Sequence, residues 1–352
     1  MLTIDLGTTW VKWGLAQNTR TVTKPGRAPS PLDLRDLWNL VQEVVHAFPG
    51  DELEGLVLTG RMAEAAVRFE NGEEVWVHAP TRQIGSDDSL EAARWRALTG
   101  YGAEMALLRH WLRQIGREAA GAIRSVLPIK DWIVFQAGGD VGTDLSSAGA
   151  LGLLDLSRRS WAETVMGSLG LTGEALPPLQ PAYTDLGPAR DFGSDYSHVR
   201  LYRGCGDGVA GTLGVGSPYD GLRVLNLGTH AVYRVLEPSP LELSPDYPSF
   251  AYPWDNQRVL TGYRLSGAGD RLSEEDAMAG TVRKIAAMVR AYPDRYSPVR
   301  PLYVTGGWAY SKELMAMLRV SLGLALVPVQ EEATLIGAAK AAMGLSGVDS
   351  AG

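Results

Sequence analysis

The first residues whose types and spacing could do chemistry lie within Leu2–Leu15. An apolar run carries Asp5, a Gly7-Thr8-Thr9 turn follows, and a second alternating run leaves that turn. Gly7 allows close approach to the backbone, and the threonine hydroxyls can donate hydrogen bonds to a phosphate. Asp5 could hold a hydrated Mg²⁺ that neutralises the phosphate. The alternative is a hairpin whose Asp and Thr side chains only satisfy turn backbone.

A partial copy of this stretch occurs in the second half, at Val224–Leu236, where Gly228-Thr229 takes the place of Gly7-Thr8. Asn226 stands where the first copy has Asp5. Internal similarity of this kind predicts two related lobes. We therefore expect a polyphosphate between two hairpins, with the metal-binding acid on the first lobe only.

A candidate general base is Asp207, which lies between glycines in Gly204–Gly208 after one apolar run and before another. Flanking glycines let a substrate approach the carboxylate, which could accept a proton from a hydroxyl as its oxygen attacks phosphorus. The alternative is a helix cap, a position that Asp favours for its bond to backbone N–H groups.

A glycine pair, Gly306-Gly307, follows the strand-like run that ends at Thr305 and precedes a helix capped by Ser311. Glycines at this point let a flat ring lie against the backbone. The alternative is an ordinary glycine-rich turn between a strand and a helix.

Several elements must position these residues, and their alternation predicts an α/β fold with covered sheets. The third strand is expected at Thr19–Lys24, and a helix is expected to open at Ser30-Pro31, where Ser is a good cap and Pro fits the first position. Asn71-Gly72 predicts a hairpin. The polar, proline-rich stretch 177–197 predicts a domain boundary, giving lobes at residues 1–197 and 198–352.

Composition limits the partners. The chain has 352 residues, a formal net charge of -7 with both signs spread along it, and one cysteine. These features argue against a nucleic-acid partner and favour a reducing, cytoplasmic setting without disulfides. No apolar run is long enough to cross a membrane, and the scattered histidines give no zinc spacing. A homodimer is the assembly that we consider.

The order of these motifs resembles the FGGY carbohydrate kinases of the actin/hexokinase-like ATPase superfamily. Leu127–Ile133 is similar to that family's proline–Asp–aromatic helix, and Thr143–Ala148 is similar to its Asp-x-Ser-x-Ala passage. Gly337-Ala338-Ala339 matches its small-residue helix. The resemblance covers nearly the whole chain and implies two actin-like (ribonuclease H-like) lobes with a nucleotide between them.

The resemblance also implies roles. Asp207 would be the general base of an ATP-dependent carbohydrate kinase, and Asp5 would organise Mg²⁺. ATP would be bound by both hairpins and the glycine pair: Thr8 and Thr9 (with Gly7) at the transferred phosphoryl group, Thr229 (with Gly228) at the other phosphates, and Gly306 and Gly307 beside the adenosine. The partner would be a small sugar, sugar acid or polyol.

Two departures from the family concern the substrate positions and an internal segment. Gly60-Arg61-Met62-Ala63-Glu64 replaces Gly-Gln-Met-His-Gly, and the usual Trp-x-Asp-x-Arg keeps only its Arg, in the stretch His78–Arg82. Arg61, Glu64, His78 and Arg82 could form a different polar pocket, with arginines suited to an acidic sugar; alternatively they are ordinary loop and strand residues. The family's long segment with a Gly-Glu-Arg-x-Pro-like loop is also shortened, at Glu237–Pro298.

These departures leave three readings open: an active kinase, a catalytically weak or inactive nucleotide-binding regulatory protein derived from one, or another superfamily ATPase with a protein partner. The retained Asp207 favours catalysis.

Overall fold

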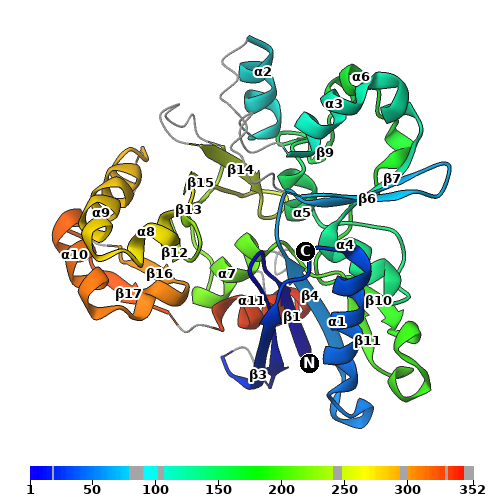
Figure 1. The fold of residues 1–352 in the computed structure, drawn as a ribbon, viewed down its shortest axis with the longest axis horizontal. Coiled ribbons are helices and arrows are strands. Elements are labelled where there is room, and N and C mark those ends of the chain that lie inside the picture. Colours follow the sequence, from blue (N-terminus) through cyan, green and yellow to red (C-terminus); the bar gives the residue numbers. More distant parts are fainter. Residues whose placement is uncertain are drawn as a thin grey trace.

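Two six-stranded sheets form the centre of the chain, and each carries one of the two Gly-Thr hairpins (Figure 1). The computed structural model describes residues 1–17, 20–78, 90–101, 107–240, 248–293, 300–329 and 332–344. Arg82 therefore lies outside the described residues.

The first sheet has the strand order β10-β11-β4-β1-β2-β3. β1 pairs antiparallel with β2 and parallel with β4, so the apolar strand that ends beside Asp5 lies at the middle of the sheet. Its strands are β1 (Leu2–Leu6), β2 (Trp10–Ala16), β3 (Val22–Pro29), β4 (Gly55–Gly60), β10 (Asp185–Pro188) and β11 (Arg200–Tyr202).

The second sheet has the order β14-β15-β13-β12-β16-β17. Here β12 pairs antiparallel with β13 and parallel with β16, as β1 does with β2 and β4. Its strands are β12 (Arg223–Leu227), β13 (Ala231–Glu237), β14 (Ser249–Pro253), β15 (Val259–Leu265), β16 (Leu302–Thr305) and β17 (Leu326–Pro328). The repeat seen in the sequence is thus a repeat of sheet topology, and the α/β expectation is confirmed.

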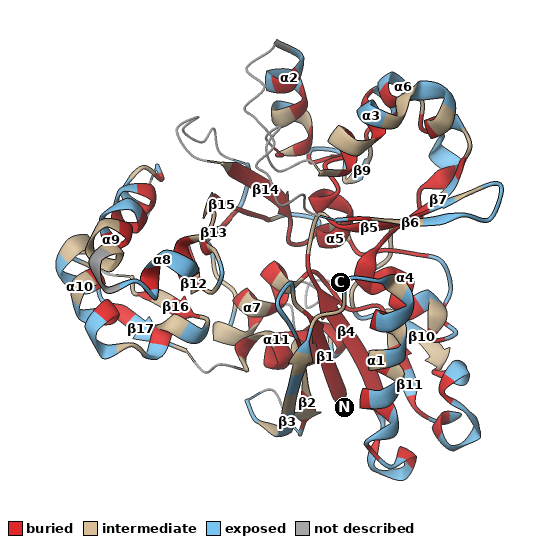
Figure 2. Cartoon of the chain, viewed as in Figure 1, coloured by how far each residue is buried: buried red, intermediate tan, exposed pale blue. Residues whose placement is uncertain are grey.

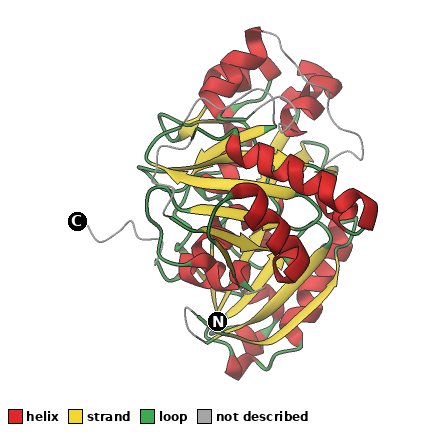
Figure 3. Cartoon of the chain, turned by 90° about the vertical axis from the view of Figure 1, so that its left-hand side faces the viewer, coloured by secondary structure: helices red, strands yellow, loops and turns green. Residues whose placement is uncertain are grey.

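Helices cover both sheets and fill the space between them (Figures 1 and 3). α7 and α11 pack together between the sheets, while α9 and α10 cover the second sheet. The helices are α1 (Leu34–His46), α2 (Leu90–Thr99), α3 (Leu107–Gly121), α4 (Ile129–Gln136), α5 (Leu145–Ala150), α6 (Glu163–Leu169), α7 (Asp207–Val215), α8 (Ala268–Leu272), α9 (Glu275–Arg290), α10 (Lys312–Leu322) and α11 (Ala333–Ala342).

Each sheet has its own apolar core, and a further core joins them. β1 and β4 are buried along their whole length, as Figure 2 shows. The joining core combines residues of α7, α11 and β14, such as Val209, Ala338 and Tyr252. Gly337 has to be a glycine because a Cβ there would collide with the backbone of Ala210 in α7. The small-residue face of α11 therefore serves close packing of the two central helices.

A smaller unit sits on the first lobe. The three-stranded sheet β6-β5-β7 is made from β5 (Ala65–Phe69), β6 (Glu74–Val77) and β7 (Ile123–Pro128), and its core contains residues of α3 and α6. A two-stranded sheet, β8 (Leu154–Asp155) with β9 (Ser160–Trp161), lies beside it. The expected Asn71-Gly72 hairpin joins β5 to β6.

Three sequence expectations differ from the structure. The third strand runs over β3, several residues later than Thr19–Lys24. α1 is capped by Asp33, whose carboxylate accepts from the N–H groups of Arg35 and Asp36, because the Ser30 hydroxyl instead accepts a bond from Arg61. The first sheet takes in β11, beyond the boundary that we predicted at residue 197. The division into two lobes at that residue stays a prediction.

Candidate nucleotide and substrate site

The two Gly-Thr hairpins meet tip to tip. The Thr9 and Thr229 hydroxyl oxygens, 220 residues apart in sequence, lie 3.1 Å from each other. Both side chains and that of Thr8 are exposed, so their hydroxyls are available to a ligand. Gly7 has to be small because a Cβ there would lie 2.6 Å from the Trp10 carbonyl oxygen, whereas one at Gly228 would meet nothing nearer than 3.7 Å. The structure thus brings together the hairpins that sequence reasoning paired.

Asp5 lies on β1 just before the first turn and is only 9% exposed. Its Oδ1 is buried and has no hydrogen-bond partner among the described residues. Burial, helped by repulsion from Asp207, raises the pKa of Asp5 to about 7, although Lys12 and Arg61 oppose the shift. A buried acceptor without a donor is costly. Asp5 is therefore suited to a cation that would supply the missing partner.

Asp207 is the first residue of α7 and not its cap, because Gly206 takes the N-cap position. Three contacts fix the turn that precedes Asp207. The Thr59 hydroxyl donates to the Cys205 carbonyl at 2.7 Å, the Gly206 N–H donates to the Ser146 hydroxyl at 3.0 Å, and Gly206 pairs with Gly60 at the end of β4. Asp207 is thereby held close enough to Asp5 for the two carboxylates to repel each other.

Burial raises the pKa of Asp207, and the attraction of Arg234 is the main opposing effect. A carboxylate with a raised pKa is a better proton acceptor than an exposed one. The position, the nearby acid and the pKa all suit a general base.

A buried network of charged side chains supports the turn that precedes Asp207. Lys130 Nζ lies 2.7 Å from Asp131 and 3.0 Å from Asp144, and it also donates to the Arg203 carbonyl at 3.2 Å. Arg203 is fully buried and reaches Asp140 at 2.6 Å. Burial alone would lower the pKa of Lys130, but Asp131 and Asp144 hold it above its usual value. Breaking such a network leaves an uncompensated buried charge, so it fixes the chain just ahead of Asp207.

The glycine pair lies beside the second hairpin. Gly306 has φ +89°, and a Cβ there would collide with the Leu227 carbonyl, so this residue must be glycine for structural reasons. The Thr305 hydroxyl donates to the Asn226 side-chain oxygen at 3.1 Å. Gly307 differs, because a Cβ at that position would meet nothing within 4 Å. Its exposed backbone is the face that a flat ring could cover.

The four predicted substrate residues are only partly brought together. Arg61 and Glu64 are buried, lie 3.6 Å apart as an ion pair, and both contact Trp76. Arg61 also interacts with Asp5 and Asp207, which places the pair beside the candidate base. His78 is exposed and lies against the Trp76 ring, 5.8 Å between centroids.

Sequence reasoning missed the residues that the second lobe contributes. Arg234 on β13 and Arg264 on β15 both act electrostatically on Asp207. Tyr252 on β14 also lies close enough to interact with Asp207. So does Tyr101, which forms an isolated β-bridge with Phe250. A charged residue within an otherwise apolar strand is the signal that could have found both arginines.

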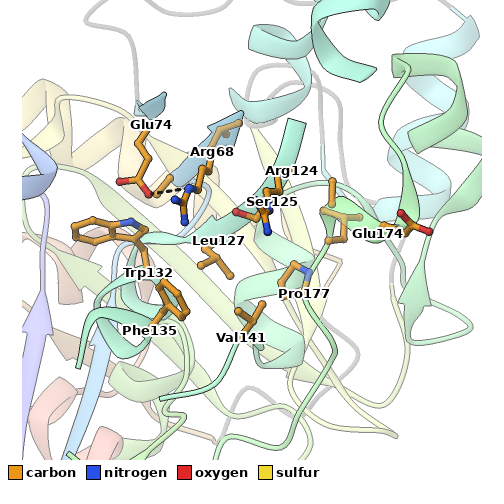
Figure 4. A pocket seen from close by; sticks show the side chains of 14 residues that line it. Arg68, Glu74, Arg124, Ser125, Leu127, Trp132, Phe135, Val141, Glu174 and Pro177 are labelled. Carbon is orange, nitrogen blue, oxygen red and sulfur yellow. Dashed lines mark ion pairs between the residues drawn. The ribbon is translucent and has the colours of Figure 1, made fainter. Parts of the chain in front are cut away.

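Two cavities of about 330 Å³ lie elsewhere, and none of the predicted site residues lines either of them. One lies between β5, β7 and α4 in the first lobe, where Arg68 and Glu74 face each other above Trp132 and Phe135 (Figure 4). The other lies behind α7, next to Cys205 and Trp254. Cavity size therefore does not mark the site; the converging carboxylates and hairpins do.

Within the described parts of the chain, no helix is long and apolar enough to cross a membrane. Those parts also hold no group of three or more His, Cys, Asp or Glu side chains arranged to bind a metal. The orphaned Oδ1 of Asp5, beside exposed threonine hydroxyls, nevertheless fits a hydrated Mg²⁺ that shares its shell with phosphate.

Comparisons with known proteins agree with this geometry. Residues 83–214 match the model of the FGGY family of carbohydrate kinases, N-terminal domain. An autoinducer-2 kinase from Enterobacter sp. (strain 638) is 27% identical over 212 residues, which are 52% of this chain and 39% of that protein. The match thus spans well under half of that relative.

Solved structures extend the likeness of the fold to nearly the whole chain. A xylulose kinase from Lactobacillus acidophilus superposes with a TM-score of 0.80 at 17% identity, covering 99% of this chain and 90% of that one. A Plasmodium falciparum glycerol kinase with ADP gives 0.78 at 15% identity, covering 98% and 89%. The actin-like architecture is therefore confirmed as the fold of this chain, and residues 83–214 are similar to the N-terminal domain of the FGGY carbohydrate kinases.

Proposed function

We propose that this chain transfers the terminal phosphoryl group of ATP to a hydroxyl of a small carbohydrate: a sugar, sugar acid or polyol. The observation that carries the proposal is the meeting of the two hairpins at Thr9 and Thr229 above two mutually repelling carboxylates, Asp5 and Asp207. A phosphate-binding end and a buried base are thus brought together from distant parts of the sequence.

In the proposed reaction, Asp207 accepts the proton of the attacking hydroxyl. The substrate oxygen forms a bond to the γ-phosphorus while the bond from that phosphorus to the β–γ bridging oxygen breaks, and ADP leaves. Thr8 and Thr9 orient the transferred group, Thr229 contacts the remaining phosphates, and the adenosine lies against Gly307. Asp5 would hold Mg²⁺, which neutralises phosphate charge when bound.

The relatives support this reaction class. The family is one of carbohydrate kinases, and one structural neighbour is a glycerol kinase described with ADP. We place the reaction in the cytoplasm, since the single cysteine, Cys205, is buried and no disulfide is possible.

The competing possibility is a nucleotide-binding regulator without catalysis. It rests on the altered substrate positions, such as Arg61 and Glu64, and on the shortened segment Glu237–Pro298. The retained, tightly held Asp207 speaks against it, since a protein that only binds nucleotide has no need of a base.

Incubation of the purified protein with Mg·ATP and a panel of aldoses, ketoses, polyols and sugar acids tests the proposal. We expect acceptor-dependent ADP release and a phosphorylated product by mass spectrometry for at least one acceptor. ATP binding without transfer to any acceptor would favour the regulator, and a failure to bind ATP would exclude both functions.

A further inference from the structure

Two arginines lie on one face of the second sheet. In the antiparallel register of β13 and β15, Arg234 lies opposite Gly262 and Arg264 lies opposite Val232. Positions two residues apart on adjacent strands are diagonal neighbours on the same face, within reach of long side chains. Both guanidinium groups act on Asp207, so this face looks toward the candidate base.

Three arginines near Asp207 have buried guanidinium atoms that no described residue satisfies. The Nε atoms of Arg61, Arg234 and Arg264 are buried and have no hydrogen-bond partner among the described residues. Among those residues, the carboxylates that act on Arg61 or Arg264 are Asp5, Glu64 and Asp207. In the proposed function Asp5 serves the metal, which leaves Glu64 and Asp207 of these three.

Burial lowers the pKa of both Arg61 and Arg264, as expected for cations removed from water. Buried charges of this kind are normally paired and hydrogen-bonded. An anionic ligand would supply acceptors for the unpartnered Nε atoms.

The position of Arg234 indicates which ligand this is. It lies five residues beyond Thr229 along β13, or about 16 Å of extended chain from the hairpin tip. It lies instead beside the first turn of α7, because a Cβ placed on Gly208 would be 3.2 Å from Arg234 Nε and would collide with the Tyr252 hydroxyl. Arg234 therefore lies beside Asp207 and away from the hairpin tip, whereas Arg264 lies nearer the tip, 2.6 Å from His230.

We propose that the acceptor is a carbohydrate that carries a carboxylate, and that Arg234 and Arg264 bind this group while Asp207 deprotonates the attacking hydroxyl. The inference rests on the proposed function and narrows its substrate class to sugar acids. A planar carboxylate matches the fork of N–H donors that guanidinium presents.

Matched acceptor pairs test this inference, namely gluconate against glucitol and xylonate against xylitol, which share a carbon skeleton and differ in one carboxylate. We expect kcat/KM to favour the acid by at least about 10-fold, the worth of one charge-assisted hydrogen bond or more. Arg234→Gln should reduce that preference by about 10-fold. The control is Arg158→Gln, since the Arg158 side chain is 81% exposed on the first lobe, and it should leave the preference unchanged.

Equal kcat/KM values for the polyols and the acids would overturn the inference and leave the kinase intact. An equal loss for both members of a pair in Arg234→Gln would also overturn it, because the arginine would then serve the transferred phosphate. Calorimetric titration of gluconate and glucitol without ATP separates the remaining cases. Gluconate binding without any transfer would support the anion site and refute the kinase, whereas no binding of either compound and no transfer would refute both.

Discussion

At the scale of single residues, Asp5 is a buried carboxylate whose Oδ1 has no hydrogen-bond partner among the described residues. A carboxylate whose pKa is about 7, against an ordinary 3.8, binds its proton more tightly in the folded protein than in the unfolded one. Its contribution to stability is therefore fully present below about pH 4 and is lost as the pH rises through about 7. In the absence of metal, ionised Asp5 should destabilise the fold.

Replacement of Asp5 by Asn, which mimics the protonated acid, should stabilise the metal-free protein. The increase in the free energy of unfolding should begin above about pH 4 and become constant above about pH 7, where it reaches at most about 4 kcal/mol. Urea unfolding of both proteins at about pH 4.5 and about pH 8, the two ends of this pH range, measures the difference. The same substitution should weaken Mg·ATP binding. An equal free energy of unfolding for both proteins at the higher pH would show that Asp5 is not desolvated.

The two kinds of site residue differ in how far sequence could find them. Asp5, Asp207 and the threonines lie in local patterns of glycine and hydroxyl groups, which made them candidates, and the resemblance to the kinase family implied their roles. Arg234 and Arg264 are thirty residues apart, and they become neighbours only through the register of β13 and β15. No local pattern encodes that register.

At the scale of elements, local signals predicted some features and missed others. The hairpin of β5 and β6 falls where the sequence placed it, because an Asn-Gly turn is a short-range effect. The start of α1 does not, since Ser30 and Asp33 are both good caps and only the tertiary contact of Ser30 with Arg61 decides between them. β14 was missed because it is recognisable chiefly by its pairing with β15.

The turn after β16 offers a test that separates folding from nucleotide binding. Gly306→Ala should destabilise the protein by about 1–3 kcal/mol, because of its positive φ and the collision with the Leu227 carbonyl. Gly307→Ala should change stability by less than about 0.5 kcal/mol, since its Cβ meets open space. If adenosine lies against this residue, Gly307→Ala should still raise the Kd for ATP by about 10-fold.

Isothermal titration of ATP and thermal unfolding of the two variants make the comparison. Unchanged ATP affinity in Gly307→Ala would remove the adenosine from this turn and leave Gly306-Gly307 as a purely structural corner.

At the scale of the whole molecule, the internal repeat was the most informative feature of the sequence. Two short segments with matched glycine and threonine predicted two related lobes. The two sheets share this pairing: the first strand of each hairpin pairs antiparallel with the second strand and parallel with a third, β4 in one sheet and β16 in the other. The sequence could not show that the lobes meet at Thr9 and Thr229, because that contact depends on the packing of α7 against α11 between them.

This arrangement gives distant parts of the chain different proposed roles. In the proposed function, Asp5 on the first sheet serves the metal and phosphate, and Asp207 at the start of α7 serves the acceptor. Loss of Asp207 should therefore abolish transfer while leaving the nucleotide groups of both hairpins in place. Asn at this position keeps the shape of the side chain and removes its ability to take a proton.

The most direct test is single-turnover transfer from Mg·ATP to the best acceptor of the panel, measured for the unaltered protein and for Asp207→Asn with ATP binding followed by calorimetry. We predict that Asp207→Asn lowers the transfer rate by at least about 100-fold and changes the Kd for ATP by less than about 3-fold. Transfer at an undiminished rate in Asp207→Asn would contradict the account.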